Sequence, residues 1–202
     1  MTTVVIPFAG VEGKTRLHAS NRVRRELSLA MLGDVLSAAR IVGTAQVVTA
    51  DAEGAALASE VGATVLDDPG SGQSAAVQAA LRGLDPGAIL IVNADLPCVV
   101  PDDLRALLAA TPAGGLALVE APDGTTNALS ISGPESFAPL YGPGSAARFR
   151  AHAESLGLQP VSVAVPNLAD DVDTLEDLQR LQLRVGPRSQ ACLSSMMAAA
   201  RG

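Results

Sequence analysis

Three groups of charged side chains in this sequence are of types that bind phosphates and metal ions. Lys14 is the only lysine of the chain and lies in a glycine-containing loop after the apolar run Val4 to Phe8, with Arg16 two residues further on. All other basic side chains apart from the histidines are arginines, so the chain keeps a single compact ammonium group, and keeps it in this loop. This pattern favours a phosphate-binding role for Lys14 over that of a solvated loop lysine. Loop amides and these two cations could together hold a triphosphate.

The segment GVEGKT resembles the phosphate loop of nucleotide hydrolases but does not match it. The motif places four residues between its two glycines, which would put the first glycine at Phe8. Here only two residues separate Gly10 from Gly13. A phosphate-loop hydrolase is therefore the weaker alternative.

Aspartates follow two other strand-like runs. Asp95 comes after Ala88 to Val92, which is apolar throughout, and an acidic cluster with Asp171 and Asp173 follows Val161 to Val165. Side chains two apart in an extended segment point to the same side, so Asp171 and Asp173 could face one ion. Each aspartate alone is typical of a turn or a helix N-terminus. Together, at the carboxyl edge of one sheet, they predict a Mg²⁺ site that also takes substrate phosphates.

The elements that would position these groups alternate between strands and helices. Such alternation predicts right-handed crossovers and an α/β fold with a mostly parallel sheet. The expected helices are Asn21–Arg40, Ala52–Val61, a helix from the turn at Gly72 to about Leu84, one that begins at Pro101, Ala146–Leu156 and a last one after Thr174. The expected strands are Val4–Phe8, Gln46–Thr49, Thr64–Leu66, Ala88–Val92 and Val161–Val165.

The alternation of strands and helices is interrupted in two places. Leu116–Glu120 and Ala128–Ile131 are short strand-like runs separated by the turn APDGTTN, which predicts a small β insertion beside the parallel sheet. From Gly186 onward the sequence has no clear period. We therefore expect one domain over residues 1–185 and a loosely ordered tail over residues 186–202.

Composition limits the partners. The 202 residues are 48% hydrophobic and 17% charged, enough for one well-buried domain, with a net charge of −7. This charge argues against a nonspecific grip on nucleic acid or an anionic membrane, so we expect a small partner. Cys98 and Cys192 match no metal spacing, and neither a signal peptide nor a long apolar run is found. We expect a cytoplasmic protein, in which the aliphatic surface of the β insertion could support a homodimer.

Six stretches in this order resemble one enzyme family, the phosphoenolpyruvate and 2-phospho-L-lactate guanylyltransferases that make the deazaflavin coenzyme F-420. The similarity runs from about Thr3 to Leu183, and YGPGSAARF together with KTRL is its most specific part. It implies a Rossmann-like nucleotidyltransferase of the glycosyltransferase-A type that uses GTP and Mg²⁺. The stretches are IPFAGVEGKTRL, GSGQSAAVQAAL, NADLPCVVPDDL, DGTTNALSIS, YGPGSAARFRAHA and DVDTLEDL.

The resemblance implies a role for each matching residue on the nucleotide side. Lys14 and Arg16 would hold the triphosphate and, with Asp95, form the catalytic set. The loop from Gly72 to Ser74 would lie along the base and ribose. The resemblance also implies that the magnesium ligands are Asp95, Asp171 and Asp173.

On the acceptor side, the resemblance implies that Thr126, Gly142 and Ser145 bind the phosphate and carboxylate of a three-carbon acid. Arg148 is a weaker candidate, because it could be only the solvated face of its helix. The acceptor's phosphate would attack the α-phosphorus of GTP and release pyrophosphate. Since that nucleophile is already ionised, no histidine is needed as a base.

The sequence departs from the family pattern at one point, and this departure bears on whether the chain is an active enzyme. The family has a second lysine in a Pro-x-Lys setting, whereas Phe8 and Ala9 follow Pro7 here. A catalytically silent nucleotide-binding module is therefore an alternative. We favour phosphoenolpyruvate over 2-phospho-L-lactate as acceptor because the alanine-rich, lysine-poor composition is typical of GC-rich bacteria, in which that substrate prevails in the family.

Overall fold

The computed structural model describes residues 2–10 and 20–199. Its centre is a seven-stranded sheet in the order β3-β2-β1-β4-β6-β5-β7. The first four strands are mutually parallel, β6 is antiparallel to both β4 and β5, and β7 is parallel to β5. The strands are β1 (Thr3–Pro7), β2 (Thr44–Thr49), β3 (Thr64–Asp67), β4 (Ile89–Val92), β5 (Leu116–Glu120), β6 (Thr126–Ile131) and β7 (Val161–Ser162).

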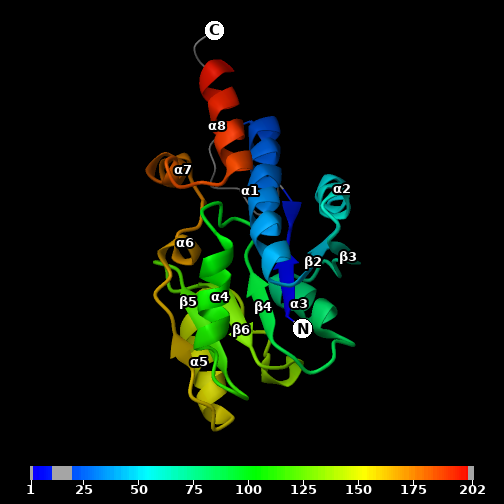
Figure 1. Cartoon of the computed structure of the whole chain (residues 1–202), viewed down its shortest axis with the longest axis vertical. Coiled ribbons are helices and arrows are strands. Elements are labelled where there is room, and N and C mark those ends of the chain that lie inside the picture. The colour runs from blue at the N-terminus through cyan, green and yellow to red at the C-terminus, as the bar shows by residue number, and fades with distance from the viewer. Residues whose placement is uncertain (1, 11–19, 200–202) are drawn as a thin grey trace.

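Helices cover both faces of the sheet (Figure 1). One face packs against α1, α2, α4 and α6, and the other against α3 and α5. None of the described helices is long and apolar enough to cross a membrane. The helices are α1 (Asn21–Val42), α2 (Ala52–Glu60), α3 (Gln73–Leu81), α4 (Pro101–Ala110), the short 3₁₀ helix η2 (Pro134–Ser136), α5 (Ser145–Ser155), α6 (Pro166–Ala169), α7 (Leu175–Leu181) and α8 (Pro187–Ala199).

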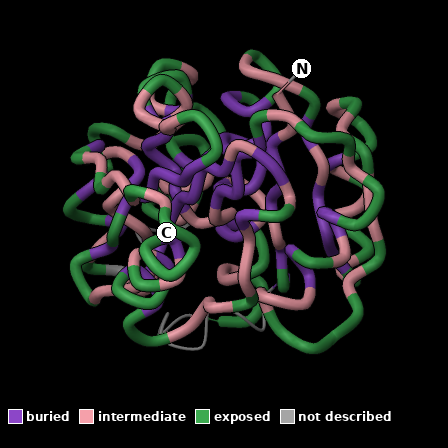
Figure 2. Tube along the Cα trace, turned by 90° about the horizontal axis from the view of Figure 1, so that it is seen from below, coloured by how far each residue is buried: buried purple, intermediate pink, exposed green. Residues whose placement is uncertain are grey.

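Strand β4, at the middle of the sheet, is apolar and buried throughout because both faces of the sheet are covered. Val4 and Ile6 of β1 pack into the layer of α1 and α4, whereas Val5 between them packs into the layer of α3 and α5. Alternation along a strand thus supplies both cores from one short run. Figure 2 shows the buried residues gathered along the central strands, inside a rim of partly exposed helices and loops.

The β hairpin predicted beside the parallel sheet is part of that sheet. Its second strand, β6, is buried at every residue and pairs with β4, from Ile89 opposite Ile131 to Val92 opposite Ala128. The reversal between the two strands is closed by Asp123, whose Oδ1 accepts from the backbone N–H of Thr125 at 2.9 Å. The predicted last strand, Val161–Val165, is shorter than expected and ends at Ser162.

The expectation of a loosely ordered tail from residue 186 was wrong for most of that segment. Helix α8 packs along α1, where it joins a small core with α7. The buried carboxylate of Asp34 accepts from the N–H groups of Arg188 at 3.0 Å and Ser189 at 2.9 Å. The Asp34 side chain belongs to α1, which is distant in sequence, and it caps the first turn of α8. The tail's own sequence carries no sign of that partner.

Candidate active site

The three acids predicted to bind magnesium lie together. One carboxylate oxygen from each of Asp95, Asp171 and Asp173 is within 4.8 Å of the others. The N–H of Val172 donates to the carbonyl of Asp95 at 3.1 Å, which ties the segment after β4 to the segment before α7. Because Val172 is fully buried, its two neighbours project together to the opposite side. We refer to these three aspartates as the acid cluster.

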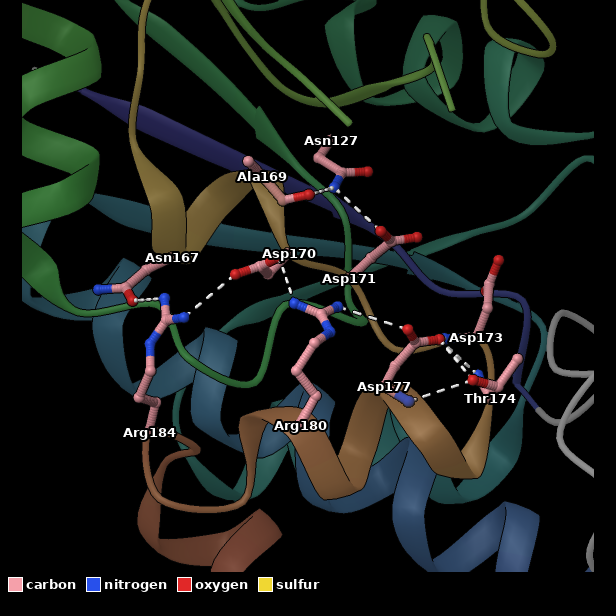
Figure 3. Close-up of polar contacts among 10 residues, drawn as sticks. All are labelled: Asn127, Asn167, Ala169, Asp170, Asp171, Asp173, Thr174, Asp177, Arg180 and Arg184. Atoms are coloured by element: carbon pink, nitrogen blue, oxygen red, sulfur yellow. Dashed lines mark hydrogen bonds and ion pairs between the residues drawn. The ribbon is translucent and has the colours of Figure 1, made fainter. Parts of the chain in front are cut away.

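The neighbouring acid, Asp170, has a different environment (Figure 3). Its carboxylate turns to the other side and forms ion pairs with Arg180 at 2.7 Å and Arg184 at 3.1 Å. Further on, Thr174 and Asp177 form a capping box, in which Asp177 accepts from the N–H of Thr174 at 2.9 Å. These contacts fix α7, so the segment that carries Asp171 and Asp173 is held at both ends.

The acid cluster is electrostatically strained when it holds no cation. Burial and, after it, the nearby carboxylates of Asp95 and Asp173 together raise the pKa of Asp171 to about 6. Like charges so close together disfavour ionisation. A divalent cation would remove this repulsion, and carboxylate oxygens are the hard ligands that Mg²⁺ prefers. The donor set therefore fits the predicted magnesium ion.

A chain of side-chain amides leads from α3 to the acid cluster. The Nε2 of Gln73 donates to Oδ1 of Asn93 at 2.7 Å, and the Nδ2 of Asn93 donates to Oδ1 of Asn127 at 3.3 Å. The Nδ2 of Asn127 donates in turn to the carbonyl of Ala169 at 3.0 Å and to Oδ1 of Asp171 at 3.5 Å. We call Gln73, Asn93 and Asn127 the amide chain. Sequence analysis included Gln73 only as part of the loop from Gly72 to Ser74, and it assigned no role to Asn93 or Asn127.

Two pockets meet at the amide chain. The first pocket, of about 220 Å³, lies at the carboxyl ends of β1 and β4. Most of its lining residues are small or apolar, and four of them carry a carboxylate or a side-chain amide. Lining residues are Pro7, Phe8, Ala9, Gly10, Ser28, Met31, Asp68, Gly72, Gln73, Ala76, Asn93, Ala94 and Asp95.

The second pocket, of about 500 Å³, lies between the β5–β6 hairpin, the loop before α5 and the segment before α7. It shares Gln73 and Asn93 with the first pocket. The acid cluster is divided between them, because Asp95 lines the first pocket whereas Asp171 and Asp173 line the second. The remaining lining residues are Asp123, Thr125, Thr126, Asn127, Tyr141, Gly142, Pro143 and Ser145.

The three residues predicted to bind the acceptor all line the second pocket. Ser145 Oγ donates to Thr126 Oγ1 at 3.1 Å, and both side chains are buried. Gly142 has a φ of 117°, a conformation that favours glycine, in the loop that leads to α5. Arg148 donates from Nη2 to the carbonyl of Leu140 at 2.7 Å and from Nη1 to that of Pro143 at 2.5 Å. Arg148 therefore holds this loop rather than facing only solvent.

The residues predicted to bind the nucleotide are placed less uniformly. Gly72 lines the first pocket, but Ser74 lines neither of the two and accepts through Oγ from the N–H of Tyr141 at 3.2 Å. Ser74 thus links α3 to the loop of the second pocket. Lys14 and Arg16 lie outside the described residues.

Comparison with known proteins places the chain among nucleotidyltransferases. A family model described as guanylyl transferase CofC like matches residues 2–194. A phosphoenolpyruvate guanylyltransferase of Sphaerobacter thermophilus is 39% identical over 194 residues, which cover 90% of this chain and 93% of that protein. The enzyme of the same name from Roseiflexus castenholzii is 37% identical over 190 residues, covering 89% of each chain.

Two solved structures share the fold. A protein from Desulfovibrio desulfuricans G20, described as a nucleotide-diphospho-sugar transferase, superposes with a TM-score of 0.78 at 17% identity, over 99% of this chain and 96% of that one. A nucleotidyl transferase from Methanothermobacter thermautotroptrophicus superposes with a TM-score of 0.66 at 19% identity, over 96% and 99% of the two chains. These likenesses confirm the predicted Rossmann-like arrangement.

Proposed function

Because the chain belongs to the guanylyl transferase CofC-like family, we propose that it transfers GMP from GTP to phosphoenolpyruvate and releases pyrophosphate. The observation that carries this proposal is the position of the acid cluster, which spans two pockets with a common wall. A transfer between two substrates needs such a junction, because the attacking oxygen and the α-phosphorus must come into line and into contact. A hydrolase needs only the first pocket.

In the proposed reaction, an oxygen of the acceptor's phosphate attacks the α-phosphorus of GTP. A bond forms between that oxygen and phosphorus, the bond between the α-phosphorus and its bridging oxygen to the β-phosphate breaks, and pyrophosphate leaves with the electron pair. The acceptor's phosphate is already ionised near neutral pH, so the protein has to supply orientation and charge neutralisation.

The residues divide this work between the two pockets. Thr126 and Ser145 would hold the acceptor by their hydroxyl groups, and the first pocket would hold the guanosine part against Gly72. The acid cluster would hold Mg²⁺, which when bound supplies the positive charge that a polyphosphate needs. Lys14 and Arg16 are proposed to add cations from the loop after β1. As GTP is a cytoplasmic metabolite, we propose that the reaction takes place in the cytoplasm, as a step in making coenzyme F-420.

Pyrophosphate release in the presence of GTP and Mg²⁺ tests the proposal. The purified chain is incubated with phosphoenolpyruvate, with 2-phospho-L-lactate or without an acceptor. We expect release that depends on phosphoenolpyruvate. Release with 2-phospho-L-lactate alone would assign the other acceptor, phosphate release without acceptor would indicate a hydrolase, and no release would indicate a silent nucleotide-binding module.

A further inference from the structure

The amide chain has only one possible orientation. The carbonyl of Ala169 and the carboxylate of Asp171 can only accept hydrogen bonds, so the group of Asn127 that faces them must be its NH₂. Its carbonyl oxygen then faces Asn93 and requires the NH₂ of that residue. The same reasoning applied once more turns the NH₂ of Gln73 toward Asn93. The orientation of all three amides is thus set by their two acceptors before α7.

This orientation leaves one acceptor oxygen on the wall between the two pockets. Gln73 is partly buried at the first position of α3 and lines both pockets. Its Nε2 is engaged by Asn93, whereas its Oε1 accepts no hydrogen bond from the described residues. Because the amide is already held in one orientation, little side-chain entropy is lost when Oε1 binds a ligand. An amide oxygen accepts hydrogen bonds, so it favours a ligand group that donates one.

The chemistry of the two substrates, as given in the proposed function, decides which ligand supplies that donor. Phosphoenolpyruvate carries only acceptor oxygens once it is ionised, so it offers nothing to Gln73 Oε1. The nucleotide offers donors on its ribose and its base. The ribose is bonded directly to the α-phosphate, which under the proposed function lies near the acid cluster. Gln73 lines the first pocket together with Asp95 and the second together with Asp171 and Asp173. The base lies a full sugar further away.

We propose that Gln73 Oε1 accepts a hydrogen bond from a ribose hydroxyl of the bound nucleotide, and that Asn93 and Asn127 hold Gln73 in the required orientation. Gln73 is then a specificity residue that selects ribonucleotides over deoxyribonucleotides. This inference rests on the proposed use of a nucleotide triphosphate but does not depend on which acceptor is used.

Calorimetric titration with GTP, 2′-deoxyGTP and 3′-deoxyGTP, in Mg²⁺ and without acceptor, tests the inference. We expect the unaltered chain to bind GTP about tenfold more tightly than one of the two deoxy analogues, which identifies the hydroxyl. Gln73→Leu should reduce that preference to within about twofold and leave the affinity for the same analogue nearly unchanged. Gln78→Leu, an exposed glutamine on the same helix, is the matched control and should keep the preference.

Two results would overturn the inference. One is a preference for GTP that survives in Gln73→Leu, and in Gln73→Ala as a second, smaller replacement. The other is an equal loss of affinity for GTP and both analogues, which would indicate that Gln73 only shapes the pocket. Melting temperatures of the variants verify that they are folded. Binding is measured without acceptor, so a failure of guanylyl transfer in the pyrophosphate assay is a separate result that bears on the proposed function alone.

Discussion

The two pockets differ in what their walls can bind. The first pocket is lined largely by small or apolar residues from α1, α3 and the carboxyl ends of β1 and β4. The second is walled by hydroxyl groups, amides and three aspartates. Uncharged base and sugar suit the first kind of wall, whereas an anionic acceptor suits the second only if a cation offsets its carboxylates. Under the proposed function, the second pocket would therefore accept an anion only with the proposed Mg²⁺ in place.

Removing a member of the acid cluster should have the largest effect. We expect Asp95→Asn and Asp171→Asn each to reduce turnover by about a thousandfold, because each would remove an anionic ligand of the proposed Mg²⁺ at the proposed point of transfer. Pyrophosphate release over a range of Mg²⁺ concentrations measures this loss. Asp102→Asn is the control, since Asp102 is 87% exposed, forms an ion pair with Arg105 and lines neither pocket. Near-normal turnover in Asp95→Asn or Asp171→Asn would show that the cluster is not the reaction centre.

A change confined to the second pocket should affect only the acceptor. We expect Ser145→Ala to raise the KM for phosphoenolpyruvate about tenfold, through loss of a hydroxyl group beside the acceptor's anionic groups, and to leave the KM for GTP within about twofold. Steady-state kinetics with each substrate varied in turn provide the measurement. Ser155→Ala, at the far end of the same helix, should alter neither value. Equal increases in both KM values would mean that the pockets are not separate sites.

The clamp on the loop of the second pocket should matter less. Arg148 donates to two carbonyls on either side of Gly142, so Arg148→Met should loosen that loop and raise the KM for the acceptor by about fivefold. Arg148→Lys should restore little of the loss, because a single ammonium group cannot reproduce the planar fork. The control is Arg150→Met, which removes an ion pair with Glu120 outside both pockets. Full rescue by lysine would show that only the positive charge is needed.

The smallest expected effect is a gain in stability. The pKa of Asp171 is about 6 in the folded protein, against an ordinary value of 3.8 for an aspartate, so the folded form binds more protons between these pH values. Stability from this group is present below about pH 4 and is lost as the pH rises through 6. At pH 7 in EDTA, Asp171→Asn should therefore raise the melting temperature by a few degrees, on the order of 2–4 °C.

Thermal unfolding at pH 7 and pH 4 provides the measurement for this gain. The difference between Asp171→Asn and the unaltered chain should shrink at pH 4, and Mg²⁺ at pH 7 should stabilise only the unaltered chain. Asp170→Asn is the adjacent control and should lower the melting temperature, since Asp170 pairs with Arg180 and Arg184. The same gain at both pH values would exclude charge repulsion as its cause.

Local patterns in the sequence predicted the parallel half of the fold and the acid cluster. Apolar runs that alternate with amphipathic helices identify β1 to β4, because strand and helix periods are set by neighbours in the chain. Asp171 and Asp173 could be placed on one side for the same reason, and the shared sheet edge added Asp95.

The amide chain depends on contacts that sequence patterns do not encode. Asn93 meets Asn127 because β4 and β6 pair in one particular antiparallel register. The pairing extends one residue beyond β4, where the N–H of Asn93 donates to the carbonyl of Asn127 at 3.0 Å. The order of residues alone cannot fix a register between strands so far apart. The NADLP stretch and the TTN stretch after the Asp-Gly turn were the available signals, and they identified Asp95 and Thr126 instead.

Helix α8 escaped prediction for a related reason. Its docking depends on the buried Asp34 of α1 and on Gly186, where any side chain would overlap that carboxylate. Such a cap joins residues about 150 positions apart, so no window of the tail's own sequence contains it.

The most direct test of the two-pocket reaction follows the atoms of the acceptor. Phosphoenolpyruvate labelled with ¹⁸O in its phosphate is incubated with GTP, Mg²⁺ and the protein, and the products are resolved by ³¹P NMR. If the acceptor's phosphate attacks the α-phosphorus, one labelled oxygen becomes the bridge to the α-phosphorus, the other labelled oxygens stay on the acceptor-derived phosphorus, and the pyrophosphate is unlabelled. Free GMP, or label in pyrophosphate or inorganic phosphate, would contradict transfer between the two pockets.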